Sequence, residues 1–90
     1  MYNVGFKGIM PTVLRIRNIR FYFYTNEHEP AHVHVTIGKG ANYPYAKILL
    51  DTLDVESCEG FSKADIASIL RIVKAYQEHL IEVWEEHFDK

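Results

Sequence analysis

The chain is poor in cysteine and has no long apolar run, and each scarcity excludes a class of protein. Cys58 is the single cysteine, so the chain cannot form an internal disulfide or offer a pair of thiols to a zinc ion. No segment approaches the roughly 20 apolar residues that a membrane-spanning helix needs. The first residues also lack the apolar centre of a secretory signal. We therefore expect a cytoplasmic protein that does not bind membranes.

The chain also lacks a strong excess of either charge, with a formal net charge of -2 over 90 residues. The charge is nevertheless uneven: residues 1–50 hold six Lys or Arg against two Glu, and residues 51–90 hold four against ten Asp or Glu. Such polarity is compatible with an acidic ligand on one side and a basic partner on the other, although many folded domains carry it without consequence. The apolar share of 48% predicts a folded chain, and its length fits one domain with one core.

Alternating apolar and polar residues predict strands in the first half of the chain. We expect strands at residues 12–17 and 20–25, joined by a turn at Asn18, and further strands at residues 32–37 and 44–50. A loop with Asn26 and Pro30 precedes the third strand. The acidic segment 51–60 (DTLDVESCEG) is interpreted as a connector.

The last third of the chain predicts a helix. Ser62 and Asp65 resemble a capping pair, and no Gly or Pro occurs from residue 63 to residue 90. Apolar side chains recur at helical spacing, at Ile66, Ile69, Leu70, Val73, Tyr76, Leu80, Val83, Trp84 and His87 or Phe88. The predicted fold class is therefore α+β, a small antiparallel sheet of about four strands with one long C-terminal helix packed on one face.

Two-residue periodicity then sorts the strand side chains onto two faces. Those expected to face the helix are Leu14, Ile16, Phe21, Phe23, Val33, Val35, Ala46, Ile48 and Leu50. Those on the opposite face are Arg15, Arg17, Tyr22, Tyr24, His32, His34, Thr36, Tyr45 and Lys47. This second set, the polar face, is expected to be open to solvent and contains no carboxylate.

Three kinds of chemistry fit the polar face. His32 and His34 lie on one side of a strand with Cα atoms about 7 Å apart, a spacing that can converge on zinc or another divalent transition metal. A third ligand would have to be His28 or Glu27, and the nearby cations disfavour a metal, so we expect no cofactor.

The second kind is RNA binding. The side chains that would stack on bases are Tyr22, Tyr24 and Tyr45, and those that would contact phosphates are Arg15, Arg17, Arg20 and Lys47. The third is metal-independent cleavage of RNA. In that case His32 and His34 supply the acid and the base, with His28 and Glu27 as auxiliary groups.

A simpler interpretation of the same residues remains open. Histidines on the solvated side of a strand, and glutamates in a proline-containing loop, need no function beyond polarity. Tyr76, Trp84 and Phe88 are interpreted as core residues of the helix.

Three segments in order, MPTVLRI, RFYFYTNEHEPAHVHV and WEEHF, resemble the small bacterial proteins grouped as domain of unknown function 4160. The most specific piece is the E-H-x-P-x-H-V-H-V signature, which begins here at Glu27. The loop is one residue shorter than in many members, and Ala31 stands where a second proline is common. Met10 matches the usual start of such proteins, so residues 1–9 are interpreted as an N-terminal extension and residues 10–90 as the single domain.

The resemblance implies a gene context like that of a toxin–antitoxin pair, and hence a small cognate partner protein. Our first hypothesis is a component of such a module that binds or cleaves RNA through the polar face. The alternatives are a non-enzymatic interaction module, acting as antitoxin or regulatory partner, and a histidine-based metal-binding protein. The sequence leaves a homo-oligomer open.

Overall fold

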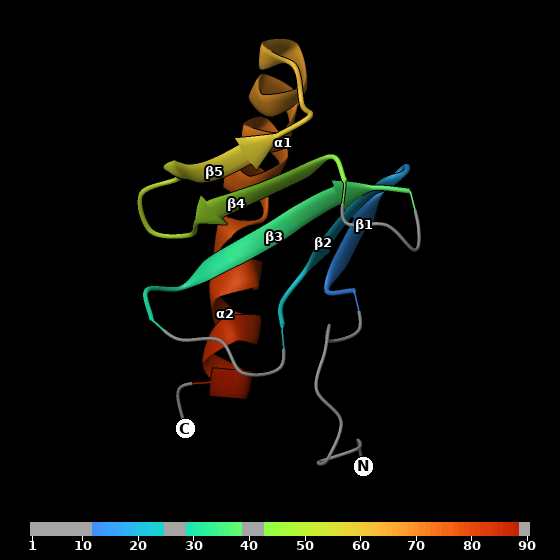
Figure 1. The fold of residues 1–90 in the computed structure, drawn as a ribbon. Coiled ribbons are helices and arrows are strands. Elements are labelled where there is room, and N and C mark those ends of the chain that lie inside the picture. Colours follow the sequence, from blue (N-terminus) through green and yellow to red (C-terminus); the bar gives the residue numbers. More distant parts are fainter. Residues whose placement is uncertain (1–11, 25–28, 39–42, 89–90) are drawn as a thin grey trace.

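A computed structural model of the chain describes residues 12–24, 29–38 and 43–88, and shows one antiparallel sheet backed by two consecutive helices (Figure 1). The elements are β1 (Leu14–Ile16), β2 (Ile19–Tyr22), β3 (His32–Ile37), β4 (Tyr45–Leu49), β5 (Val55–Glu59), α1 (Lys63–Ala75) and α2 (Gln77–Phe88). The five strands lie in the sheet in chain order. The α+β class is thus confirmed, whereas the proposed extension at residues 1–9 lies outside the described residues.

The fifth strand corrects the interpretation of residues 51–60 as a connector. A turn after β4 leads into β5, which pairs antiparallel with β4 and contains an irregularity opposite Lys47 and Ile48. Val55 is half-buried, and the other four residues of β5 are exposed. Because β5 is an edge strand with almost no buried side chain, it lacks the alternation by which a half-buried strand is recognised.

The turn of the first hairpin lies one residue earlier than the sequence predicts. Ile16 is paired with Ile19, so Arg17 and Asn18 form the whole loop. Arg17 has a φ of 57°, in the left-handed region that favours glycine. Its placement on the polar face is therefore wrong: Arg17 is an exposed turn residue, and Arg20 on β2 lies opposite Arg15 instead.

The C-terminal helix is confirmed in extent but is interrupted once. It begins with a complete capping box, in which Ser62 and Asp65 each bond the other's backbone N–H. The interruption is at Tyr76, and there the Gln77 side chain donates a hydrogen bond of 2.5 Å to the carbonyl oxygen of Leu50. Tyr76 is 40% exposed, so its assignment to the core is wrong. A side-chain bond to the sheet thus accompanies a break that neither Gly nor Pro explains.

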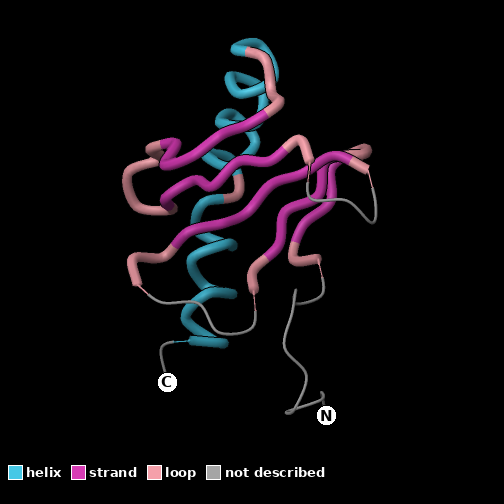
Figure 2. The backbone as a smooth tube through the Cα atoms, in the orientation of Figure 1, coloured by secondary structure: helices cyan, strands magenta, loops and turns pink. Residues whose placement is uncertain are grey.

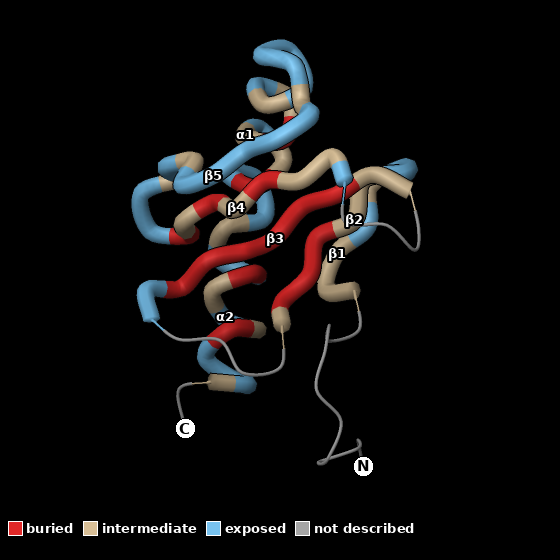
Figure 3. The backbone as a smooth tube through the Cα atoms, viewed as in Figure 1, coloured by how far each residue is buried: buried red, intermediate tan, exposed pale blue. Residues whose placement is uncertain are grey.

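Both helices lie on the same side of the sheet, behind it in the view of Figure 2. The core between them contains the predicted strand residues Phe21, Phe23, Val33, Val35, Ala46, Ile48 and Leu50, together with Ile69, Val73, Leu80 and Trp84. Leu14 and Ile16 are partly buried against this core. Figure 3 shows that burial continues along β3 and into β2, whereas β5 is largely exposed. The prediction of which face packs on the helix is confirmed.

Candidate functional site

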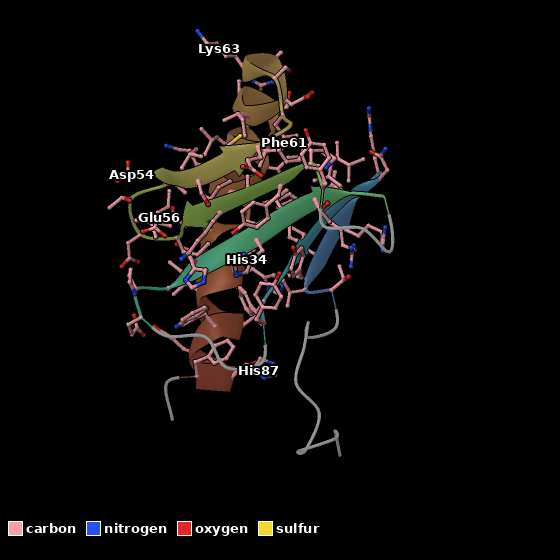
Figure 4. The ribbon with its side chains drawn as sticks, viewed as in Figure 1. His34, Asp54, Glu56, Phe61, Lys63 and His87 are labelled. Atoms are coloured by element: carbon pink, nitrogen blue, oxygen red, sulfur yellow. The ribbon has the colours of Figure 1, made fainter. Side chains whose placement is uncertain are left out.

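The polar face lies on the side of the sheet away from the helices, where Figure 4 labels His34 near its centre. Strand register arranges its side chains in two rows. One row contains Tyr22, His34 and Lys47, from β2, β3 and β4. The neighbouring row contains Arg15, Arg20, Thr36 and Tyr45. Strand pairing therefore places Arg15, Tyr22, His34 and Lys47 on this face, and ring contacts with His34 bring Tyr24 and His32 to it.

The centre of this face is buried, which corrects the expectation of an open surface. His32 is 3% exposed, His34 is 5% exposed, and Tyr22 and Thr36 are fully buried. Tyr24, Tyr45 and Lys47 are half-buried. Neither base stacking on Tyr22 nor a pair of solvated strand histidines fits such burial. The physical reason is that large neighbouring rings pack against one another in stacked and T-shaped arrangements and leave little room for water.

The imidazole of His34 is the centre of that ring cluster. It stacks against the rings of Tyr22, at 5.4 Å between centroids, and Tyr45, at 5.9 Å. The edges of Tyr24 and His32 close the remaining sides, at 4.5 and 5.0 Å. His34 Nδ1 is 3.3 Å from the Tyr45 hydroxyl, so the phenol can pass or receive a proton there.

The imidazole of His32 has a defined orientation. Its Nδ1 lies 2.8 Å from the carbonyl oxygen of Pro30. Because a carbonyl oxygen can only accept, Nδ1 must carry the proton, and in the neutral ring the lone pair is on Nε2. Nδ1–H bonds of this kind are how proteins orient histidines that act as bases or ligands. The two histidines therefore form an adjacent pair in which one tautomer is set by the backbone.

Two buried donors of the polar face have no hydrogen-bond partner among the described residues. They are Nε of Arg20 and the hydroxyl of Tyr22. The Arg20 guanidinium lies over the Tyr22 ring, at 5.4 Å from its centroid. Burial strongly raises the pKa of Tyr22, and the neighbouring Tyr24 hydroxyl raises it further, although the two hydroxyls do not meet hydrogen-bond geometry. Tyr22 therefore stays a neutral donor.

Lys47 lies at the margin of the face and is already paired. Its Nζ is 2.8 Å from Glu56 of β5, and this contact lowers the pKa of the Glu56 carboxyl. The unpredicted fifth strand thus brings a carboxylate to the face that the sequence suggested had none. Lys47 is consequently less available to a phosphate than Arg15 or Arg20.

The contacts of Trp84 with Glu29 and His32 were not predicted from the sequence. Trp84 was assigned to the core, where it does lie, but its ring is also 5.1 Å from that of His32. Its Nε1 lies 3.3 Å from a carboxylate oxygen of Glu29. Trp84 begins the WEEHF segment of the resembled family, whereas Glu29 stands at an unspecified position of the E-H-x-P-x-H-V-H-V signature, so no sequence signal pointed to their contact.

The described residues contain no cluster of three or more His, Cys, Asp or Glu side chains able to hold a metal ion. His28 and Glu27, the predicted auxiliary or third-ligand residues, lie outside the described part of the chain. Within residues 12–24, 29–38 and 43–88, no helix is long and apolar enough to cross a bilayer.

Comparison with known families finds one relationship. The family model described as "Domain of unknown function (DUF4160)" matches residues 18–85, which include the histidine signature and most of both helices. No curated protein and no solved structure matches the chain. Since the match covers most of the sequence, this protein belongs to the DUF4160 family.

Proposed function

We propose that this protein is the RNA-acting component of a toxin–antitoxin-like module, and that its polar face binds a phosphodiester and cleaves it without a metal. The observation that supports this most directly is a pair of buried donors, Arg20 Nε and the Tyr22 hydroxyl, that have no partner among the described residues and lie beside two adjacent histidines. A buried donor left unpaired costs about 1–3 kcal/mol, so an acceptor supplied by a bound ligand would stabilise both groups.

A phosphate group has the chemistry that these donors need. Its oxygens accept from both a guanidinium and a phenol, and arginine suits phosphate because its planar fork presents several N–H groups. Arg15 lies directly across from Arg20, an arrangement of like charges that is unfavourable in an empty sheet. An anion near both guanidinium groups would offset that repulsion. Arg15 is exposed and Arg20 half-buried, so this end of the face is the part that solvent reaches.

The histidine pair then supplies proton transfer. One imidazole takes the proton of a ribose 2′-hydroxyl as that oxygen forms a bond to phosphorus, and the other protonates the 5′-oxygen as its bond to phosphorus breaks. The products are a 2′,3′-cyclic phosphate and a free 5′-hydroxyl, with no net gain or loss of protons. Nε2 of His32 fits the base because its Nδ1 is bonded to the backbone. The guanidinium groups stabilise the charge that develops on the phosphoryl oxygens.

Burial sets a condition for this reaction. Because both histidines are at least 95% buried, substrate contact requires the half-buried Tyr24 or Tyr45 side chain to turn aside. Side-chain rotations of this kind are common when a ligand binds.

The binding step is tested with a single-stranded RNA of mixed sequence and the variant Arg15→Gln/Arg20→Gln. We expect its affinity to fall and the slope of log K against log salt to decrease by about 0.7 for each lost phosphate contact. Arg71→Gln is the control for a lost positive charge, because Arg71 is exposed on α1. Equal affinities for the double variant and the control would contradict the assignment.

The cleavage step is tested with His32→Asn and His34→Gln. Asparagine at position 32 keeps an N–H that can reach Pro30, so it removes proton transfer with little loss of structure. We expect each variant to stay folded by circular dichroism and to lose cleavage, which in the unchanged protein should persist in a chelator. Cleavage that survives in both folded variants would remove the histidines from the mechanism.

A second candidate, a non-enzymatic interaction module, is favoured by the exposed edge of β5. Four of its five residues are exposed, and the strand has a neighbour on one side only. An extended segment of a partner protein could add to it as a further strand. Here Glu59→Lys should weaken complex formation with the cognate partner, whereas His32→Asn should not.

A further inference from the structure

Two motifs that lie far apart in the sequence meet at the start of β3. Trp84 of α2 contacts Glu29 through its indole nitrogen and His32 through its ring. Glu29 directly precedes Pro30, whose carbonyl oxygen accepts the bond from His32 Nδ1. One bond thus connects α2 to the loop before β3, and the other connects this loop to the imidazole of His32, all within residues 29–32. In Figure 1 the start of β3 lies alongside α2, consistent with this connection.

The indole N–H is a polar group that the core alone does not explain. Trp84 is 1% exposed and packs against Phe23 and Phe88, at 5.3 and 4.5 Å between ring centroids. Phenylalanine could make similar apolar contacts without placing a donor in the interior. A buried indole nitrogen needs a hydrogen-bond partner, and here the partner is the carboxylate of an exposed residue. The bond therefore holds a surface loop residue to a fixed point of the core.

We infer that Trp84 is a positioning residue for His32: by holding Glu29, it places the Pro30 carbonyl so that His32 keeps its proton on Nδ1 and presents Nε2 to substrate. This inference rests on the proposed function, because it concerns the base of the same reaction. Trp84 acts only through other residues and does not touch the reacting atoms. Its ring also packs on the imidazole and limits the rotation of His32.

The test is the tautomer of His32, measured from its two ring-nitrogen chemical shifts by NMR at a pH where the ring is neutral. The variants are Trp84→Phe, which removes the donor, and Glu29→Ala, which removes the acceptor. In the unchanged protein we expect the Nδ1–H form. In both variants we expect the two nitrogen shifts to converge, as the ring exchanges between tautomers. Glu29→Gln, which keeps an acceptor oxygen, should restore the original pattern.

Phe88→Leu is the matched control. Phe88 packs on Trp84 in the same cluster, but the structure shows its ring contacts with Phe23, Trp84 and His87 rather than with His32. The Phe88→Leu variant should leave the His32 tautomer unchanged while lowering the stability of the protein. An unaltered tautomer in Trp84→Phe would overturn the inference, and so would an equal change in Phe88→Leu, since the effect would then be one of packing alone.

The same variants separate this inference from the proposed function. If the protein cleaves RNA, Trp84→Phe should lower the rate by about tenfold, the lower end of the range for residues that orient a functional histidine. If no variant and no condition gives cleavage while the tautomer changes as expected, the positioning role stands and the proposed reaction is wrong. If cleavage is present but the His32 tautomer does not change in Trp84→Phe, the proposed reaction stands and the positioning role is wrong.

Discussion

Replacing Tyr22 with phenylalanine should make the protein more stable. The Tyr22 ring is fully buried, and its hydroxyl has no hydrogen-bond partner in the described structure. Such an unpaired group costs about 1–3 kcal/mol, and phenylalanine keeps the ring and its stacking on His34. Taking the low end, a gain of about 1 kcal/mol would raise the Tm by roughly 4–8 °C for a domain of this size. Urea denaturation at neutral pH measures the gain directly.

The raised pKa of Tyr22 adds a second readout. In the unfolded chain a tyrosine loses its proton near pH 10, whereas buried Tyr22 keeps its proton. The unfolded state therefore binds fewer protons above that pH, and stability falls as the pH rises. Tyr22→Phe removes this contribution, so its stability advantage should grow as the pH rises through about 10.

Tyr45→Phe is the control for both measurements. The Tyr45 hydroxyl does have a partner, His34 Nδ1, so its removal should destabilise the protein by about 0.5–1.5 kcal/mol. If Tyr22→Phe destabilises as much as Tyr45→Phe, the Tyr22 hydroxyl is paired in solution and the reasoning from an unpaired donor fails. If Tyr22→Phe is more stable yet binds RNA as well as the unchanged protein, the hydroxyl is not a phosphate contact.

Four further predictions concern the scaffold. Arg17→Gly should raise the free energy of unfolding by about 0.5–1 kcal/mol, because glycine relieves the positive φ, and should weaken RNA binding no more than Arg71→Gln does. Ser62→Ala should cost about 1 kcal/mol by removing the helix cap, as measured by urea denaturation. Gln77→Ala should cost about 1 kcal/mol and lower the Tm, since the helix break loses its bond to the sheet. Lys47→Met should reduce the loss of stability on acidification. The contact with Lys47 lowers the pKa of Glu56 in the folded protein, so this ion pair stabilises the fold at pH values above the ordinary pKa of 4.5. The stabilisation is lost as the pH falls through the lowered pKa of the folded protein.

The sequence predicts the elements whose side chains alternate between two environments. The third strand is predicted at residues 32–37 and is found as His32–Ile37, because each second side chain is apolar. The helix start at Ser62 is predicted from its own capping residues. Such signals are local, so they can be recognised without knowing which other strands or helices pack against the segment. Strand β5 gives no such signal because it buries little on either face.

The sequence predicts which strand residues lie on the polar face but not that the centre of this face is buried. Local periodicity correctly places Tyr22, His32 and His34 on one side of the sheet. It does not indicate that these side chains are buried, because burial depends on which rings neighbouring strands bring against them. Arg17 was misplaced for a related reason: a residue at a strand end can belong to the turn, and the hairpin register decides which.

By itself, the sequence determined the α+β class, the face that packs on the helix and the family, since these depend on periodicity, capping and motif order. Only the tertiary structure decided that the polar face is a packed ring cluster, that two of its donors lack partners among the described residues, and that Trp84 reaches Glu29 and His32. The physical reason is distance along the chain. Trp84 and Glu29 are 55 residues apart, and no local propensity encodes a contact made only when a helix closes over the sheet.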